Sequence, residues 1–478
     1  MTAGARIRSA PEEFRRRYPE YERTRALDAL RRTEYGYLDE QDHVYLDYTG
    51  AGLAARSQLR AHTERLHGNV FGNPHSENPT SAAATELVER ARMRVLRHLR
   101  ADPDEYAVVF TPNATGAARL VGEAYPFSRR TRLVLTVDNH NSVNGLREFA
   151  RRRGARTRYV PTRAPWLRVD PDALGAALRR GRGLFAYPAQ SNFSGVRHPL
   201  GWVELAQRHG YDVLLDVAAY LPTGRLDLGA VRPEFVIMSW YKVFGYPTGV
   251  GCLVARREAL ARLVRPWFSG GTIQAVSVRL PWHVLAPDET AFEDGTLNFL
   301  SIPDIQVGLD WLDSIGMDLV DCRVRCLTGW LLDRLTALRH GDGSPMVRLY
   351  GPAGTESRGG TVAFNFLDAA GRVVDERLVA ADASAARISL RTGCFCNPGA
   401  GEDAFGLDPR ALRPLRRSGM RGLDEYLELI GLPTGGAVRV SLGLASTLGD
   451  VERFLAFAGR AYRDRVTAAG HLPARERC

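Results

Sequence analysis

Residues 235–255 read FVIMSWYKVFGYPTGVGCLVA. An apolar run, Phe235 to Met238, leads into Lys242, and a turn rich in glycine and proline precedes a second apolar run, Val250 to Ala255. This pattern predicts two adjacent strands joined by a tight turn, with Lys242 at a functional tip. Because aromatic residues flank the lysine, it would be poorly hydrated, which lowers its pKa and favours the reactive neutral amine.

Lys242 is also the only lysine of the chain, although lysine and arginine together number 64. Arginine supplies charge and forked hydrogen bonds, but it does not lose its proton in proteins. Attack on a carbonyl, or proton transfer near neutral pH, requires the amine of lysine. Lys242 is therefore a candidate for a covalent role with an aldehyde cofactor. The alternative is that mutation in a genome rich in G and C replaced the other lysines with arginine, and that Lys242 remains without a function.

Composition and charge exclude several classes of protein. The chain has 478 residues, enough for a large core and two domains. A net charge of +10 would suit nucleic acid, but the basic residues are scattered. The short clusters at 15–17 and 151–153 lack the interleaved aromatic residues of a nucleic-acid surface. We expect no nucleic-acid partner. The charge would instead form a solvated face or attract anionic substrates and partners.

The cysteines and the termini favour a cytoplasmic protein. Six cysteines are too few and too irregularly spaced for a disulfide framework, so free thiols are expected. The first 25 residues are charged and lack the apolar centre of a secretory signal. No apolar run approaches the roughly 20 residues that span a bilayer. We expect a soluble cytoplasmic protein with no membrane partner and no metal site.

Apolar runs alternate with helical segments from about Tyr45 to Ala255, a pattern typical of a mostly parallel sheet with helices on both faces. The runs are Ala107–Phe110, Arg132–Val137, Gly183–Tyr187, Tyr211–Val217 and Phe235–Met238. After about Pro303 a long amphipathic segment, Asp304–Arg339, begins a smaller α+β region. The predicted division is an amino-terminal helical segment over 1–44 that packs on the small domain, a large cofactor-binding domain over 45–303, and a small domain over 304–478.

Phe110 is followed by TPNATGAARLVGEA, residues 111–124, which reads as a strand end, a turn and a helix. Thr111, Asn113 and Thr115 could cap this helix and leave its first amide groups free. Free amides and the helix dipole form an anion site that suits a phosphate. An ordinary helix cap is the alternative.

Two residues that follow predicted strands could meet the same ligand. Asp216 ends the run Val213–Leu215, so its carboxylate is costly to bury without a partner. A pyridinium nitrogen would satisfy it and would stay protonated as an electron sink, whereas a helix-capping carboxylate is the alternative. His140, in VDNHNSVNG, could stack on an aromatic ring or could be an ordinary structural histidine.

Taken together, seven segments resemble the class V aminotransferase group of fold-type I pyridoxal phosphate enzymes. The resemblance is closest to the amino-terminal, cysteine-desulfurase-like part of molybdenum cofactor sulfurases. The segments are YLDYTGAG from Tyr45, VFGNPHSEN from Val70, YPAQSNFSG from Tyr187, SWYKVFGYPTG from Ser239, FEDGTLNFL from Phe292, RTGCFCNPGAG from Arg391 and VRVSLG from Val438. They occur in order over nearly the whole chain from Tyr45.

The resemblance implies pyridoxal 5'-phosphate as the cofactor and a role for each matching residue. Lys242 would bond to its aldehyde, Asp216 would pair with its pyridinium nitrogen, and His140 would stack on its ring. Asn192 would lie near the phenolic oxygen and the substrate. The phosphate would be held by Ala114, Thr115 and Ser239, and by Gly295-Thr296 of a neighbouring subunit, which implies a homodimer with shared active sites.

For the substrate, the resemblance implies that Arg391 binds a carboxylate through its planar fork and that Arg439 supports the same site. A desulfurase also needs a thiol that becomes a persulfide, and the resemblance places it on Cys396 rather than Cys394. Pro398 and the glycines after it suggest a mobile segment. The alternative is that both cysteines are small buried core residues.

Three departures from the family pattern concern the reaction and its acceptor. Ala219 stands where many cysteine desulfurases have a glutamine, a departure that the sulfurase branch shares. Gly401 stands where several sulfurases carry another cysteine. The sequence ends near Cys478, so a molybdenum cofactor acceptor would have to come on another protein.

The function that we expect is a pyridoxal phosphate-dependent cysteine desulfurase, a sulfurtransferase that converts L-cysteine to L-alanine. Cys396 would carry the sulfur to a molybdoenzyme, a carrier protein or a small molecule, and selenocysteine is a further candidate substrate. An alternative is a carbon–sulfur lyase, or another elimination or transamination enzyme, which would make pyruvate or another keto acid and would not need Cys396. A non-enzymatic scaffold or sensor on the same fold is a third possibility.

Overall fold

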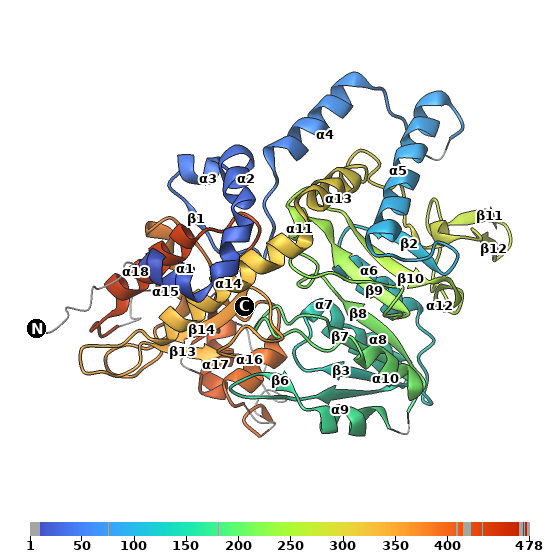
Figure 1. The fold of residues 1–478 in the computed structure, drawn as a ribbon. Coiled ribbons are helices and arrows are strands. Elements are labelled where there is room, and N and C mark those ends of the chain that lie inside the picture. Colours follow the sequence, from blue (N-terminus) through green and yellow to red (C-terminus); the bar gives the residue numbers. More distant parts are fainter. Residues whose placement is uncertain are drawn as a thin grey trace, which may run out of the picture.

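The structure, a computed structural model, describes residues 10–74, 76–179, 181–407, 410–413, 422–432, 434–467, 472 and 474–475. His75 and Cys478, which the sequence analysis quoted, lie outside these ranges. A seven-stranded sheet forms the larger part of the molecule (Figure 1). Its order is β2 (Tyr106–Thr111), β10 (Gly251–Arg256), β9 (Phe235–Ser239), β8 (Tyr211–Asp216), β7 (Gly183–Pro188), β3 (Arg132–Thr136) and β4 (Arg156–Val160).

Only β10 runs against its neighbours in this sheet, and the other pairs are parallel. Most of these strands are buried along their whole length, because helices cover both faces and leave no face for polar side chains. Val108 and Phe110 of β2 therefore face one core while Val109 faces another. This arrangement confirms the expected α/β fold with a large, mostly parallel sheet.

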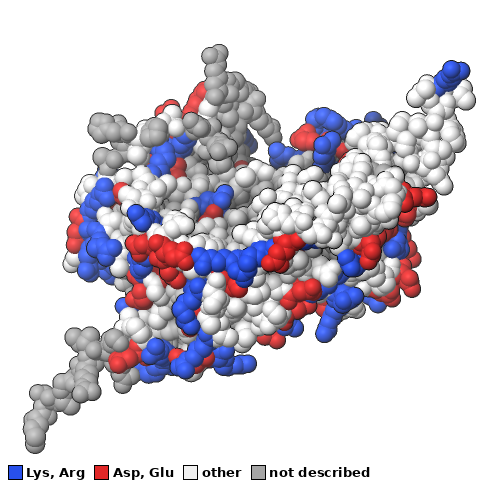
Figure 2. Space-filling model, turned by 90° about the horizontal axis from the view of Figure 1, so that it is seen from above, with Lys and Arg blue, Asp and Glu red and all other residues white. Residues whose placement is uncertain are grey.

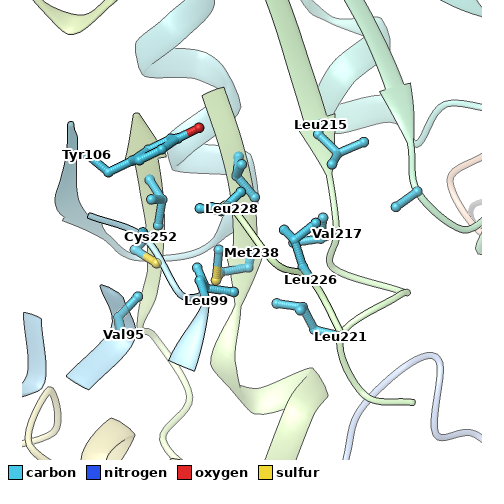
Figure 3. Close-up of a cluster of buried hydrophobic side chains, with 14 of the residues drawn as sticks. Val95, Leu99, Tyr106, Leu215, Val217, Leu221, Leu226, Leu228, Met238 and Cys252 are labelled. Carbon is cyan, nitrogen blue, oxygen red and sulfur yellow. The ribbon is translucent and has the colours of Figure 1, made fainter. Parts of the chain in front are cut away.

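Different helices cover the two faces of the sheet (Figure 1). On the first face lie α5 (Pro79–His98), α9 (Pro171–Leu178), α10 (Trp202–Arg208) and α13 (Asp304–Ile315). On the second lie α6 (Ala114–Ala124), α8 (Leu146–Arg152) and α12 (Arg257–Leu260). Figure 3 shows the first core, in which Cys252 and Met238 point toward Val95 and Leu99. Cys252 is thus a fully buried thiol.

The second sheet is antiparallel, with the order β13 (Val347–Tyr350), β14 (Thr361–Phe366), β17 (Ala437–Ser441) and β16 (Arg391–Gly393). It shares a core with α14 (Met317–Thr336), α15 (Glu376–Ala385) and α18 (Leu448–Tyr462). The expected long segment from Asp304 is two helices, since Gly316 between α13 and α14 has φ of 86°. Left-handed backbone of this kind favours glycine and ends α13. The proposed boundaries at 44 and 303 stay a prediction.

The amino-terminal segment packs on this second core. Phe14 of α1 (Ala10–Arg17) is fully buried, and its ring lies 5.6 Å from that of Trp330. Asp28, which follows η1 (Pro19–Thr24), accepts a hydrogen bond from the buried Arg323 at 2.6 Å. Further along, β1 (Val44–Tyr45) pairs with β15 (Ile388–Ser389), which brings the beginning of the chain beside β16 and β17.

The remaining elements are shorter or lie at the periphery. They are α2 (Ala26–Glu34), α3 (Tyr37–Glu40), α4 (Arg56–Gly68), α7 (Asn141–Asn144), α11 (Trp240–Phe244), α16 (Pro398–Ala404), α17 (Leu423–Ile430), β5 (Thr162–Arg163), β6 (Arg168–Val169), β11 (Ile273–Ser277), β12 (Trp282–Leu285) and η2 (Glu289–Phe292). Across the described ranges, no helix has both the length and the apolar character that crossing a bilayer requires.

Candidate active site

A cavity of about 170 Å³ opens at the carboxyl ends of β3, β7, β8 and β9, where parallel α/β sheets bind ligands. The structure brings together here most of the residues that the sequence singled out. Those that line the cavity are Ala114, Thr115, His140, Asn192, Asp216, Ser239 and Lys242. They come from segments up to 128 positions apart in the chain, so only the fold assembles them.

Lys242 lies on α11, which directly follows β9. The tight turn expected here is instead a short helix, because Trp240 and Phe244 stack on one another at 5.7 Å and bury its inner face. Gly245 then ends the helix with φ of 80° and lies against the backbone of 53–54, where a Cβ atom would clash. This close contact sets where the helix ends relative to the cavity.

The pKa of Lys242 is lowered from its ordinary value. Burial is the largest cause, and the positive charges of Arg439 and Arg391 act in the same direction. Asp216 opposes them by favouring the ammonium form. The net result favours the neutral amine, the form of lysine that attacks a carbonyl carbon.

Asp216 ends β8, and its side chain is almost completely buried. The amide of Ala218 donates to its Oδ1 at 2.9 Å. Burial raises the pKa of this carboxyl, and Lys242 only partly offsets that effect. Within the described residues no arginine pairs with Asp216, so a cationic group of a ligand would stabilise its charge.

His140 is the residue before α7, and its ring faces the same cavity. The amide of Ser142 donates to Nδ1 at 3.1 Å, which assigns the proton of the neutral ring to Nε2. Burial, together with the charges of Lys242 and Arg439, lowers the pKa of His140 to about 4. The ring is therefore uncharged at neutral pH and can lie flat on another ring.

The amino end of α6 forms the anion side of the cavity. Asn113 caps the helix by accepting from the amide of Gly116 at 2.9 Å. Ser239 accepts from the amide of Ala114 at 2.9 Å. The expectation of several free amides was therefore too generous. Of these first amides in the described structure, that of Thr115 has no hydrogen-bond partner, and the hydroxyls of Ser239 and Thr115 lie beside it.

Arg391 and Arg439 are cross-strand partners on β16 and β17, and Asp47 binds both. Asp47 Oδ2 accepts from Arg391 Nη2 at 2.7 Å, and Oδ1 accepts from Arg439 Nη2 at 2.9 Å. The side chain of Arg391 is half exposed, whereas Arg439 is buried. Arg391 therefore presents free donors to a ligand while Asp47 fixes its orientation.

Cys396 lies in the loop between β16 and α16, at the molecular surface. Its carbonyl oxygen accepts from the amide of Asn141, next to His140, at 2.7 Å. Phe395 and Cys396 have φ of 56° and 52°, a left-handed conformation that is strained for side chains of this size. The loop is thus held against the cavity in a conformation that it would not adopt alone.

Asn192 connects this loop to the cavity. Its Nδ2 donates to the carbonyl of Phe395 at 2.8 Å, and its Oδ1 accepts from Nδ2 of Asn397 at 2.8 Å. Asn397 Nδ2 also donates to the carbonyl of Asp138 at 2.7 Å. The expected position of Asn192 at the cavity wall holds, but much of its hydrogen bonding is directed to the loop.

One expectation differs from the structure. Cys394 is in a disulfide bond, so the expectation that all cysteines are free thiols is wrong for this residue. Cysteines pair by closeness in space rather than in sequence, which the spacing could not reveal. Thr296 lines a separate cavity of about 340 Å³ in the same chain. Its expected contact, with the phosphate held by a neighbouring subunit, stays a prediction.

Sequence reasoning missed three residues that shape the site: Asp47, Ser142 and Asn397. Asp47 and Asn397 lie inside segments quoted for the resemblance, YLDYTGAG and RTGCFCNPGAG, but nothing in those segments shows which distant residue each contacts. Ser142 stands two residues after His140 in a run of small polar residues, the usual signal of a cap for a short helix.

A comparison with known families identifies the fold. The family model for Aminotransferase class-V matches residues 44–454. This chain belongs to the class-V aminotransferase family. Relatives found by sequence comparison include molybdenum cofactor sulfurases. That of Bos taurus is 36% identical over 456 residues, covering 90% of this chain and 51% of that protein. The tomato protein (Solanum lycopersicum) is 34% identical and covers 94% of this chain and 59% of that protein.

The chain thus spans little more than half the length of these curated relatives. Among solved structures it superposes on the apo cysteine desulfurase of Thermococcus onnurineus NA1 with a TM-score of 0.76, at 22% identity, covering 91% of this chain and 98% of that chain. It also superposes on the cystine C–S lyase C-DES in complex with cysteine persulfide, with a TM-score of 0.69 at 17% identity, covering 88% of this chain and 98% of that chain.

Class-V aminotransferases use pyridoxal phosphate, and the residues of this cavity fit that group. The buried Asp216 has one backbone donor and no cationic partner, which suits a protonated pyridine nitrogen. The free amide of Thr115 at the end of an 11-residue helix suits a phosphate. Lys242 lines the same cavity and has a lowered pKa, which suits an aldehyde.

Proposed function

We propose that this chain is a pyridoxal phosphate-dependent cysteine desulfurase that moves sulfur from L-cysteine to an acceptor through Cys396. The observation that carries the proposal is the attachment of the Cys396 loop to the cavity wall. Asn192 of that wall donates to Phe395, and Asn141, beside His140, donates to Cys396 itself. A thiol on a strained loop at the mouth of the site can reach a bound substrate and then an acceptor.

Each residue of the site has a task in this reaction. When bound, pyridoxal phosphate supplies an electron sink for the substrate. Arg391 binds the α-carboxylate of cysteine through its free donors, and Asp47 holds its orientation. Neutral Lys242 binds the cofactor aldehyde and later carries protons to and from the substrate carbons. Asp216 would pair with the pyridine nitrogen and favour its protonated form, and the uncharged ring of His140 would stack on the cofactor.

The chemical step balances without an external oxidant. The sulfur of Cys396, as a thiolate, attacks the sulfur of the substrate, so an S–S bond forms as the Cβ–S bond breaks. A proton replaces sulfur on Cβ, and alanine leaves. The sum is cysteine plus the Cys396 thiol giving alanine plus a Cys396 persulfide. An acceptor thiol then takes the terminal sulfur as its own persulfide, and the Cys396 thiol is regenerated. Delivery of that sulfur as sulfide to a metal site also requires a two-electron reductant, such as a dithiol.

We also propose that the acceptor is molybdenum cofactor held on another protein. The similarity to molybdenum cofactor sulfurases over 90% of this chain supports this acceptor rather than an iron–sulfur scaffold. The exposure of Cys396 supports a protein-bound acceptor, because the sulfur must leave the cavity to be delivered. Assay of a sulfur-free molybdoenzyme, activated by this protein and cysteine, tests the acceptor separately from desulfuration.

A homodimer with shared active sites is the assembly that we propose. The hairpin of β11 and β12 exposes Val276, Val278, Leu280, Trp282 and Val284. Figure 2 shows a broad area without charged side chains on the side of the molecule where Figure 1 places this hairpin. Contiguous exposed apolar surface of this kind is typical of an interface. Light scattering on the purified protein would give the mass of a dimer, and a monomer at all concentrations would exclude it.

Incubation with L-cysteine tests the proposed reaction. Alanine should form, and the intact protein should gain the mass of one sulfur atom on Cys396. The Cys396→Ala variant should bind the cofactor but make no alanine, whereas Cys252→Ala, which removes a buried thiol, should remain active. Pyruvate in place of alanine, with full activity of Cys396→Ala, would favour a carbon–sulfur lyase like the one that this fold matches.

A further inference from the structure

A second hollow, of about 420 Å³, opens at the amino ends of strands of the large sheet. Arginine is the main residue type that lines it, and no aspartate or glutamate does. The lining residues are Arg129, Arg130, Thr131, Arg132, Arg156, Gly181 and Arg182. The cavity of Lys242 opens at the carboxyl ends of the same strands, so the length of the sheet separates the two.

The sheet register places like charges directly opposite one another. Arg132, the first residue of β3, pairs with Arg156, the first residue of β4. On its other side Arg132 pairs with Gly183 of β7. Neighbouring strands lie about 4.8 Å apart, and paired residues point to the same face. Two guanidinium groups in this position repel each other and destabilise the pair, unless an anion lies between them.

Glycines bring the arginine backbones close together. A Cβ atom on Gly183 would lie 2.1 Å from the carbonyl oxygen of Arg132, so only glycine fits there, and its φ is 140°. This contact lets the amide of Arg132 donate to the carbonyl of Arg182 at 2.9 Å. Gly154 likewise lies against the side chain of Arg129, where a Cβ atom would be 2.9 Å from Cγ. The hollow is therefore built by the backbone and is not a chance meeting of long side chains.

These arginines have no counter-ions among the described residues, whereas nearby arginines do. None of the five that line the hollow forms an ion pair with a carboxylate there. By contrast, Arg151 pairs with Glu148 at 3.0 Å and Arg262 pairs with Asp212 at 2.6 Å. The hydroxyl of the buried Tyr211, which abuts Gly181, lies beside the guanidinium group of Arg132, so the nearest side-chain oxygen to this arginine is uncharged. An anionic acceptor is the group that the hollow lacks.

We propose that this arginine hollow binds an oligophosphate, the chemistry shared by inorganic pyrophosphate and the phosphate chain of a nucleoside diphosphate. Guanidinium groups bind phosphate oxygens through paired hydrogen bonds, which the compact ammonium of lysine cannot do. A single phosphate group carries at most about two negative charges, so linked phosphates balance five guanidinium groups better. The ligand would neutralise the repulsion between Arg132 and Arg156 at the end of the sheet remote from the chemistry.

Calorimetric titration of the cofactor-loaded protein at low ionic strength tests the proposal, with inorganic pyrophosphate and ADP as the probes. The wild type should bind pyrophosphate at one site. The variant Arg132→Gln/Arg156→Gln/Arg182→Gln should bind it at least about tenfold more weakly, since it removes three charge-assisted contacts. If ADP binds as strongly as pyrophosphate, the hollow recognises the phosphates alone. If ADP binds more strongly, the ligand of the hollow is a nucleotide.

A matched variant, Arg16→Gln/Arg32→Gln/Arg97→Gln, loses the same net charge at three exposed helical positions outside any ion pair in the described ranges. It should bind pyrophosphate as the wild type does, and both variants should retain full turnover of cysteine. If the triple variant does not fold, the pyrophosphate affinity of Arg132→Gln alone is measured in its place. The proposal fails if the wild type does not bind, if the matched variant loses as much affinity, or if the hollow variant binds normally. It also fails if polyglutamate or duplex DNA binds more tightly than either probe.

Discussion

Asp47 and Arg391 form a two-pronged ion pair although 344 positions separate them in the chain. Arg391 donates to Asp47 through Nε at 3.0 Å and through Nη2 at 2.7 Å. The same carboxylate is a partner of the buried Arg439, whose Nη1 donates to the carbonyl of Asn192 at 2.9 Å. One acidic residue near the start of the chain thus orients the proposed substrate-binding arginine and links it to the wall that holds the Cys396 loop.

Substitution Asp47→Asn should destabilise the protein and weaken substrate binding. Removing the charge leaves Arg439 buried without a counter-ion, a change that costs about 3 kcal/mol in comparable buried pairs. We expect this loss in the free energy of unfolding from urea titration. The KM for cysteine should rise more than kcat falls, because Arg391 loses its fixed orientation.

The matched control is Asp42→Asn, which removes an ion pair between the exposed side chains of Asp42 and Arg453. Exposed pairs of this kind contribute at most about 1 kcal/mol. Equal destabilisation by the two substitutions would show that Asp47 has no special role in the site.

Substitution Asn397→Ser should release the Cys396 loop. Serine can still cap α16, but it is too short to donate to both Asn192 and Asp138 as Asn397 does. The strained backbone at Cys396 would then relax, and iodoacetamide should modify this thiol several times faster than in the wild type. Mass spectrometry of digested protein measures the rate at Cys396 against that at Cys252, which is buried.

Asn141→Ala is the control for this experiment. The side chain of Asn141 is exposed, and the contact with the Cys396 carbonyl is made by its backbone amide, which alanine retains. The rate of modification should stay at the wild-type value. An unchanged rate in Asn397→Ser as well would contradict the view that the asparagines hold the loop.

His140 should remain uncharged from pH 8 down to about pH 5 in the cofactor-free protein, because its pKa is lowered to about 4. The unfolded chain takes up a proton on this residue near its ordinary pKa of 6.5, before the folded protein does. His140 therefore costs stability as the pH falls from 6.5 toward 4, and it costs none at pH 8. NMR of labelled histidine, assigned with His140→Gln, follows the titration; a midpoint near 6.5 would contradict the buried position beside Lys242.

The large sheet and its ligand-binding edge could be predicted from the sequence because both depend on local pattern. Apolar runs marked β3, β7, β8 and β9, and polar residues just after them marked the edge where Asp216 and Lys242 lie together. The small helix α11 was missed, since its five-residue span carries no periodicity distinct from that of the strand before it.

Contacts between distant segments could not be predicted. No local signal connects Asp47 to Arg391 or Asn192 to Asn397. Asp47 reaches Arg391 through its bridge to Ser441 of β17, and Asn192 meets Asn397 only after the two sheets have packed together. The residue roles assigned through family resemblance remain proposals for this chain, and the contacts described above show how each could be tested by one substitution.

The most direct test of the account uses the fact that Lys242 is the only lysine. Cofactor-free protein should take up pyridoxal phosphate and become coloured, and borohydride reduction should then fix one cofactor covalently to each chain. Peptide mapping should place that group on Lys242, and Lys242→Ala should take none. A colourless protein, or a label found only on the amino-terminal amine, would contradict the central claim that this buried amine is where the cofactor is bound.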